Sequence, residues 1–206
     1  MKILFQGDSI TDWFRRGDRD DIMGSNYVTM IAGEMGRKFP EKYEFLNRGI
    51  SGSRSVDILA RMPKDIIALK PDLLSLLIGI NDVWHRTFDS GITPDQYETF
   101  CNLIVKYVKE ALPDVKIMIL EPFVLKGSAT AEKWSFFKNE TKLIAKAAKK
   151  VAKDNKLIFV PLQKKFDEAQ KLTKEGYWLI DGVHPTAAGH YLIKEAWQEA
   201  FDKNFG

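Results

Sequence analysis

The feature of this sequence that most constrains its fold is an alternation of short apolar runs with longer segments of helical period. Each apolar run is too short to form a helix alone, and several are apolar throughout, as in strands covered on both faces. Strands that alternate with helices predict a mostly parallel sheet between helix layers. The sequence therefore predicts an α/β fold, a three-layer α/β/α sandwich around a five-stranded sheet. The expected strands are Ile3–Phe5, Tyr43–Leu46, Leu73–Ile78, Val115–Leu120 and Leu157–Val160.

The segments between these runs are predicted to be helical. Residues 97–112 and 192–201 each carry apolar residues at i, i+3 and i+4, which form one stripe along a helix. Cys101 lies within the first stripe, so we expect a packed thiol rather than a reactive one. It is the only cysteine, which excludes an intramolecular disulfide.

A third amphipathic segment, residues 137–151, carries lysines opposite its apolar stripe. A lysine-rich face can bind nucleic acid, but it is more often a solvated surface, and the formal net charge of the chain is only +3. We therefore expect neither a nucleic-acid partner nor a membrane partner. Trp134 could belong to the core or to a contact between subunits, which leaves self-association open. The lysines are Lys142, Lys146, Lys149 and Lys153.

Length and composition indicate one domain, residues 1–206, with the 45% apolar and 29% charged residues of an ordinary globular protein. No apolar run approaches the roughly 20 residues that a membrane span requires. The run at the N-terminus is also shorter than the roughly 7–15 residues of a signal-peptide core. The expected location is therefore cytoplasmic.

Ligands of parallel α/β sheets bind beyond the carboxyl ends of the strands, where the strand order reverses. The residues after the first three expected strands read GDSITD (7–12), NRGISGSRS (47–55) and GINDVWH (79–85). Because glycine, aspartate and serine are turn formers, the first stretch could be only a turn and a helix cap. Alternatively, Ser9 is a nucleophile, and the chain must then supply a base, an orienting acid and donors for an oxyanion.

Among the three histidines, His184 is the best candidate for that base. Asp181 stands three residues before it, and Pro185 disfavours helical geometry at His184, which places this pair in a loop before the last helix. His190 falls inside that helix as a surface or packing residue. His85 is predicted to lie in a loop and has no acidic residue at a useful spacing.

A metal site is the alternative use of these polar residues. Asp8, Asp12, Asp181 and His184 offer ligands, but one histidine and scattered acids lack the spacing of a known site. We therefore expect no metal and no other cofactor, and we assign Asp8 and Asp12 to turn and cap roles.

Taken together, four blocks resemble those of the SGNH/GDSL hydrolase family: GDSI (7–10), Gly52 in the second loop, GIND (79–82) and DGVHP (181–185). They stand in the family's order, and the one departure is Ile10 in place of leucine. The resemblance implies a flavodoxin-like fold with strand order 2-1-3-4-5. It also implies a serine esterase that works without a cofactor.

The same resemblance implies the roles of individual residues. Ser9 would be the nucleophile, His184 the general base and Asp181 the acid that orients the imidazole. The oxyanion hole would consist of the backbone N–H groups of Ser9 and Gly52 and the side-chain amide of Asn81. Simpler interpretations stay open, because Gly52 could serve only a turn of positive φ and Asn81 could only cap its loop.

Within the family, GINDVWH and YWLIDGVHPTAAGH resemble acetylxylan esterases and related carbohydrate deacetylases. Trp13, Trp84 and Trp178 each lie within a few residues of a block, where flat aromatic faces could pack against sugar rings or belong to the core. The expected substrate is a small acetylated oligosaccharide.

Two alternatives remain at this stage. One is a lysophospholipase- or thioesterase-type hydrolase of longer acyl esters. The other is a flavodoxin-like binding module without catalysis. Such a module needs no Asp–His pair, so the DGVHP block argues against it.

Overall fold

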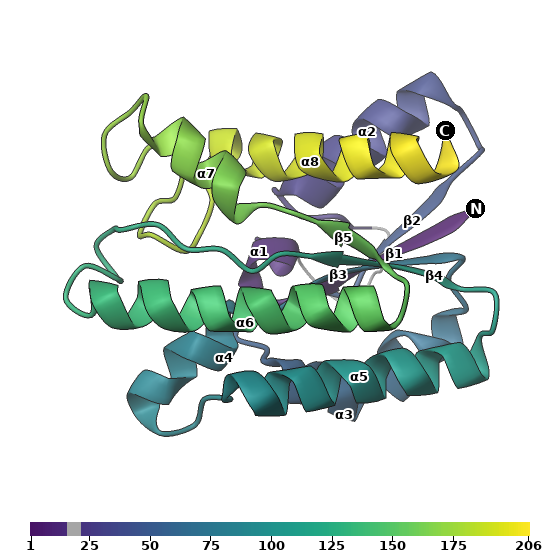
Figure 1. The fold of residues 1–206 in the computed structure, drawn as a ribbon. Helices are drawn as coiled ribbons and strands as arrows, with labels where there is room; N and C mark the ends of the chain where they lie inside the picture. The colour runs from purple at the N-terminus through teal and green to yellow at the C-terminus, as the bar shows by residue number, and fades with distance from the viewer. Residues whose placement is uncertain (16–21) are drawn as a thin grey trace.

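A five-stranded sheet lies at the centre of the computed structural model, which describes residues 1–15 and 22–206 (Figure 1). All neighbouring strands are parallel, and their order is β2-β1-β3-β4-β5. The predicted sheet and strand order are confirmed, and the strand ends differ from the expected runs by one or two residues. The strands are β1 (Lys2–Gly7), β2 (Glu44–Asn47), β3 (Leu73–Leu77), β4 (Lys116–Leu120) and β5 (Ile158–Val160).

Helices cover both faces of this sheet and complete the predicted three layers (Figure 1). One layer holds α2 (Tyr27–Lys38), α7 (Gln163–Gln170) and α8 (Ala187–Phe205). The opposite layer holds α3 (Ser55–Asp65), α5 (Pro94–Ala111) and α6 (Trp134–Asp154). The short helical segments are α1 (Ser9–Asp12), α4 (Ile80–Trp84) and the 3₁₀ turns η1 (Ile67–Leu69) and η2 (His85–Phe88).

The core lies between the sheet and the two helix layers. The apolar residues of β1 and β3 are almost wholly buried, because helices cover both of their faces. Trp197 of α8 donates its indole N–H to the Ser75 hydroxyl of β3 at 3.0 Å, which satisfies two polar groups inside the core. Cys101 is buried in α5, as predicted, and burial raises the pKa of its thiol.

The strand order brings the ends of β1 and β3 together. From β1 the chain passes to β2 on one side and then returns to β3 on the other side, so the order reverses at β1. Gly7 and Leu77, the last residues of β1 and β3, are paired in register, and α1 and α4 begin two and three residues later. The loops that follow these strands therefore meet at one edge of the sheet, where ligands of such folds bind. Among the described residues, no helix is both long and apolar enough to cross a membrane.

Candidate functional site

Ser9 is the first residue of α1 and lies directly beyond the carboxyl end of β1. Asp8 caps this helix, as predicted, because its carboxylate accepts the backbone N–H of Ile10 at 3.0 Å. Burial raises the pKa of Asp8 to about 7. The Ser9 side chain is mostly buried, and its Oγ lies 3.0 Å from Nε2 of His184, within hydrogen-bond distance.

The other ring nitrogen of His184 contacts Asp181, with 2.7 Å between Nδ1 and Oδ2. The second carboxylate oxygen of Asp181 accepts the backbone N–H groups of Val183 and His184 at 2.9 and 2.8 Å. Burial opposes ionisation of Asp181, but these hydrogen bonds outweigh it and lower its pKa to about 2. The hydrogen bond to Asp181 raises the pKa of His184. The arrangement therefore links Ser9, His184 and Asp181 in one hydrogen-bonded chain.

The loop that holds Asp181 is fixed by the segment that follows β4. Leu125 donates its N–H to the carbonyl of Gly182 at 2.9 Å, and Ala129 donates to the carbonyl of Asp181 at 3.0 Å. The two backbones approach so closely that a Cβ on Gly127 would lie 2.4 Å from the carbonyl carbon of Asp181. A side chain at position 127 would therefore displace the Asp181 loop.

Gly52 lies in a tight turn after β2, in which the N–H of Ser53 bonds the carbonyl of Ile50 at 3.2 Å. Its φ of +80° is the value that glycine supplies at the third position of a type II turn. Ile50 donates its N–H to the carbonyl of Gly7 at 3.1 Å, so this turn adjoins the turn of Ser9. Asn81, the second residue of α4, donates its side-chain amide to the carbonyl of Ser53 at 3.1 Å. The three sequence-predicted oxyanion donors therefore belong to one connected group of loops.

Two of the three candidate tryptophans contact the ring of His184. The Trp13 ring stacks on the His184 ring at 5.3 Å between centroids and 25°, and the Trp84 ring lies 5.9 Å away at 48°. The Trp178 ring packs instead against Tyr177 at 4.9 Å. The structure thus places Trp13 and Trp84 against the catalytic candidates, and Trp178 in the segment that precedes them.

The remaining histidines lie outside the hydrogen-bonded chain. His190 is a packing residue: it is 1% exposed, stacks on Tyr27 and contacts the Trp13 ring at 6.0 Å. Burial lowers its pKa to about 4, so it is neutral at physiological pH. His85 begins the 3₁₀ turn η2 rather than lying in an irregular loop, and burial lowers its pKa as well.

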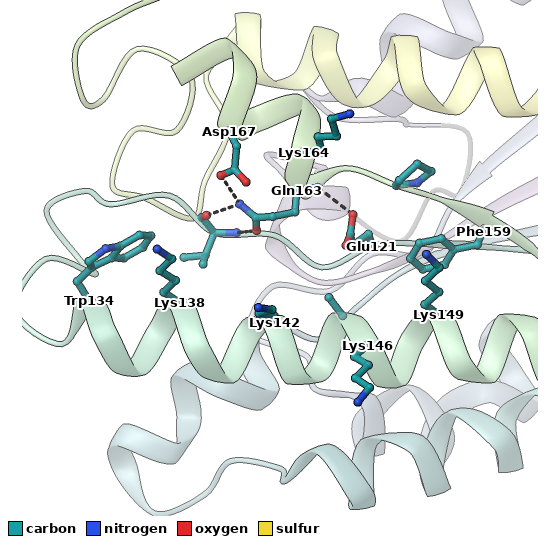
Figure 2. A pocket seen from close by; sticks show the side chains of 13 residues that line it. Glu121, Trp134, Lys138, Lys142, Lys146, Lys149, Phe159, Gln163, Lys164 and Asp167 are labelled. Atoms are coloured by element: carbon teal, nitrogen blue, oxygen red, sulfur yellow. Dashed lines mark hydrogen bonds between the residues drawn. The ribbon is translucent and has the colours of Figure 1, made fainter. Parts of the chain in front are cut away.

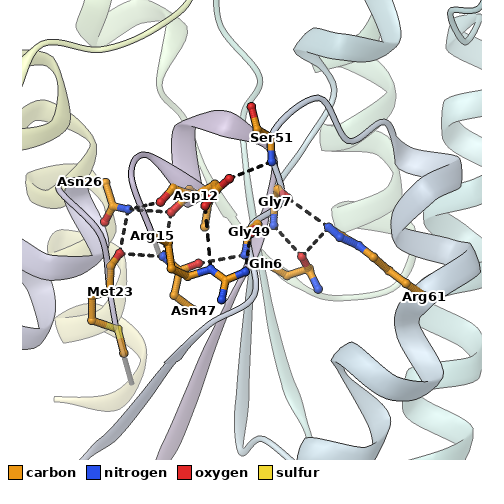
Figure 3. A network of polar contacts seen from close by, with 11 residues as sticks. Gln6, Gly7, Asp12, Arg15, Met23, Asn26, Asn47, Gly49, Ser51 and Arg61 are labelled. Atoms are coloured by element: carbon orange, nitrogen blue, oxygen red, sulfur yellow. Dashed lines mark hydrogen bonds and ion pairs between the residues drawn. The ribbon is translucent and has the colours of Figure 1, made fainter. Parts of the chain in front are cut away.

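Asp12 differs from its predicted cap role. Its carboxylate reaches across to the loop after β2 and accepts the N–H of Ser51 at 3.0 Å (Figure 3). Below this contact, Asn47 donates to the carbonyl of Thr11 at 2.7 Å and accepts the N–H of Gly49 at 2.9 Å. Residue type alone did not reveal this network, because aspartate and asparagine are ordinary turn residues and the partners are backbone groups of a distant segment.

A separate groove of about 560 Å³ lies between α6 and α7 (Figure 2). Trp134 borders it, half-buried and packed against the edge of the core, and the groove contains none of the candidate catalytic residues. Its lysines are exposed, in agreement with the prediction of a solvated face. The groove lysines are Lys138, Lys142, Lys146, Lys149 and Lys164.

Within residues 1–15 and 22–206, no group of three or more His, Cys, Asp or Glu side chains is arranged to hold a metal ion.

Comparisons with known proteins identify the family of the chain. Residues 5–192 match the model of the GDSL-like lipase/acylhydrolase family. The chain is 33% identical over 207 positions to an acetylxylan esterase of Geobacillus stearothermophilus, covering 95% of this chain and 91% of that protein.

Solved structures give the same result. A protein of Parabacteroides merdae described as a GDSL-like lipase superposes with a TM-score of 0.90 at 39% identity, over 98% of this chain and 95% of that one. An acetylxylan esterase of G. stearothermophilus superposes with a TM-score of 0.88 at 30% identity, over 100% and 94% of the two chains. Together with the sheet order, these matches show that the chain is a carboxylic ester hydrolase and belongs to the GDSL-like lipase/acylhydrolase family.

Proposed function

We propose that the chain hydrolyses acetyl esters through an acyl-enzyme on Ser9, with His184 as general base and Asp181 as the orienting acid. The observation that carries this proposal is the hydrogen-bonded chain from Asp181 through His184 to Ser9, with distances of 2.7 and 3.0 Å. A serine hydroxyl is a weak nucleophile, and it attacks efficiently only when an adjacent base removes its proton.

In the acylation step, Oγ of Ser9 attacks the ester carbonyl carbon while its proton passes to Nε2 of His184. The tetrahedral intermediate collapses, the bond to the alcohol oxygen breaks, and His184 returns the proton to the departing alcohol. Asp181 stabilises the imidazolium that exists between these two transfers and fixes its tautomer. Water then attacks the carbonyl carbon of the acyl-enzyme while His184 accepts its proton. The bond to Oγ of Ser9 breaks, His184 returns the proton to Oγ, and the carboxylic acid leaves.

The negative charge that develops on the carbonyl oxygen requires preorganised donors. The backbone N–H groups of Ser9 and Gly52 and the amide of Asn81 are the donors that this proposal assigns. The Asn81 amide has two hydrogens, and its contact with the Ser53 carbonyl uses one of them. The second hydrogen is free to bond the oxyanion.

The proposed substrate is a small acetylated oligosaccharide. The similarity to an acetylxylan esterase supports the acetyl group and the sugar. Solved structures of the G. stearothermophilus esterase include catalytic mutants at a serine and at an aspartate, which supports the same residue types in the catalytic roles here. The flat rings of Trp13 and Trp84 beside His184 support a sugar acceptor, because aromatic faces pack against the apolar faces of sugar rings.

The experiment compares acetate release from acetylated xylo-oligosaccharides with that from ethyl acetate, and it includes p-nitrophenyl esters from acetyl to octanoyl. We expect the acetylated oligosaccharide to have the higher kcat/KM of the two acetyl esters, and the acetyl member to lead the p-nitrophenyl series. The variant Trp84→Ala should raise KM for the oligosaccharide by a larger factor than KM for ethyl acetate, because only the oligosaccharide offers a sugar ring to the indole. A steady rise of kcat/KM with acyl length would instead favour a lysophospholipase- or thioesterase-type activity.

A further inference from the structure

The turn that carries Gly52 has little apolar packing of its own. Ile50 is 43% exposed and Ser51 is also exposed. Apart from its two chain neighbours, no described residue has a heavy atom within 4 Å of the point where a Cβ on Gly52 would stand. A backbone donor in such a turn keeps its position only if polar contacts to neighbouring segments hold the turn.

The first of these contacts comes from the helix of the nucleophile. Asp12 is the last residue of α1, three residues after Ser9, and its carboxylate accepts the N–H of Ser51 at 3.0 Å (Figure 3). The backbones are also in close contact here, since a Cβ on Gly49 would lie 2.5 Å from the amide nitrogen of Asp12. Asp12 therefore ties the residue directly before Gly52 to the helix that carries the nucleophile.

The second contact comes from the opposite side, from the start of α4. The buried carboxylate of Asp82 accepts the backbone N–H of Ser55 at 3.1 and 3.2 Å, and it also accepts the Ser55 hydroxyl. Burial raises the pKa of Asp82 to about 6, against the opposing effect of the bonds from Ser55. Burying a carboxylate costs free energy of folding unless hydrogen bonds satisfy it, so the bonds between Asp82 and Ser55 should be retained. Because Ser55 stands three residues after Gly52, in the first turn of α3, these bonds restrict the chain there.

We propose that Asp12 and Asp82 are positioning residues that hold the Gly52 turn from its two sides and so aim the Gly52 N–H at the oxyanion. The inference rests on the oxyanion role of Gly52 in the proposed function. A positioned donor contributes most when charge develops on the carbonyl oxygen, so loss of either carboxylate should reduce kcat more than it changes KM.

The variants are Asp12→Asn and Asp82→Asn, with Asp72→Asn as the matched control. Asp72 also accepts a backbone N–H, that of Lys2 at 2.6 Å, but it precedes β3 at the opposite end of the sheet. Because Asp82 is buried, Ser55→Ala is a milder second variant that removes only the hydroxyl bond. Circular dichroism and the thermal midpoint identify the folded variants, and kinetics on p-nitrophenyl acetate are measured well below that midpoint.

We expect Asp12→Asn and Asp82→Asn each to lower kcat by about 10–100-fold, the range for a misplaced catalytic group. KM should stay near wild type, and the Ki of a boronic acid that forms a tetrahedral adduct should rise by the same factor as kcat falls. The double variant should lose less than the product of the two single losses, because both carboxylates act on one turn. Asp72→Asn should match the wild type in kcat and Ki.

Wild-type kcat and Ki in folded Asp12→Asn and Ser55→Ala would overturn the inference. It would also be overturned if the Asp72→Asn control lost as much activity as the Asp12→Asn and Asp82→Asn variants. The variant Asn81→Ala separates this failure from a failure of the proposed function. If Asn81→Ala lowers kcat while the carboxylate variants do not, the oxyanion hole stands and only the positioning role is wrong. If none of these variants changes kcat or Ki, the oxyanion assignment itself is wrong.

Discussion

The Asp181–His184–Ser9 chain and the Gly52 turn lie at the same edge of the sheet, but they are built in different ways. The first consists of three side chains that bond one another directly, at 2.7 and 3.0 Å, although they come from opposite ends of the sequence. The second is an exposed turn of the backbone, and residues on either side of Gly52 bond Asp12, Asn81 and Asp82.

The two regions also differ in how well the sequence predicts them. The chemistry of the first region lies in residue types, so a serine, a histidine and an aspartate at the ends of predicted elements indicate it directly. The second region depends on where backbone atoms lie, which residue types describe only weakly. Substitutions in the first region should therefore abolish turnover, whereas those around the turn should reduce it by smaller factors.

The largest effect is expected from Ser9→Ala, which removes the nucleophile. Loss of the serine in serine hydrolases costs on the order of 10⁶ in kcat, so hydrolysis of p-nitrophenyl acetate should fall to the limit of detection. The fold should persist, because among the residues that the structure describes the Ser9 hydroxyl bonds only the half-buried ring of His184. Circular dichroism provides the control, and wild-type turnover by a folded Ser9→Ala protein would refute the assignment of the nucleophile.

The next effect is expected from Asp181→Asn, with a loss of about 10⁴-fold in kcat by analogy with serine proteases. The pH dependence gives a second readout. The hydrogen bond to Asp181 raises the pKa of His184 from its ordinary value, and only the neutral imidazole accepts a proton, so kcat/KM of the wild type should fall as the pH drops through that raised pKa. In Asp181→Asn this acidic limb should move to lower pH. An unchanged limb would show that Asp181 does not act on the catalytic histidine.

A smaller loss is expected from Asn81→Ala. Removal of one oxyanion donor costs about 2.7–4 kcal/mol, or roughly 100–1,000-fold in kcat, with a smaller change in KM. A residue that merely caps its loop would instead cost about 1 kcal/mol of stability and leave kcat nearly intact. Measuring kcat, KM and the thermal midpoint together distinguishes the two, and a lowered midpoint with normal kcat would assign Asn81 to structure.

The smallest effect is expected in the groove between α6 and α7. The exposed lysines there lie apart from the candidate catalytic residues, so the reversal Lys142→Glu should leave kcat and KM on a neutral acetyl ester near wild type. Assays at low ionic strength make this test most sensitive, because salt screens interactions between distant charges. A marked change in kcat would indicate that the groove is coupled to the site.

The sheet was predictable because its strands are short apolar runs and its helices carry apolar stripes, and both patterns follow from burial on one face or two. The strand ends were less predictable, as in β1, which extends through polar Gln6 to Gly7 because backbone pairing with β3 continues there. Helix α3 was not identified individually, and Pro63 lies inside it, a residue that usually argues against a helix interior.

At the site, the Asp181–His184 pair was predictable from its spacing in a loop before the last helix, and its role beside Ser9 from the resemblance of the four blocks to the family. The bond from Ser51 to Asp12 and those from Ser55 to Asp82 were not, because each joins a carboxylate to backbone or hydroxyl groups on another strand end. Such contacts require the register of neighbouring loops, which periodicity does not specify. For the same reason, the sequence did not predict that Trp178 packs on Tyr177 rather than on His184.

The most direct test of the central claim is identification of the acyl-enzyme. The wild type is mixed with excess p-nitrophenyl acetate, quenched with acid during the first turnover and digested, and its peptides are analysed by mass spectrometry. We expect an acetyl group on Ser9 that forms as fast as p-nitrophenol is released in a burst, and no such group in Ser9→Ala. Acetylation of a different residue at the rate of turnover, or full turnover in the wild type without acetylation of Ser9, would contradict the proposed mechanism.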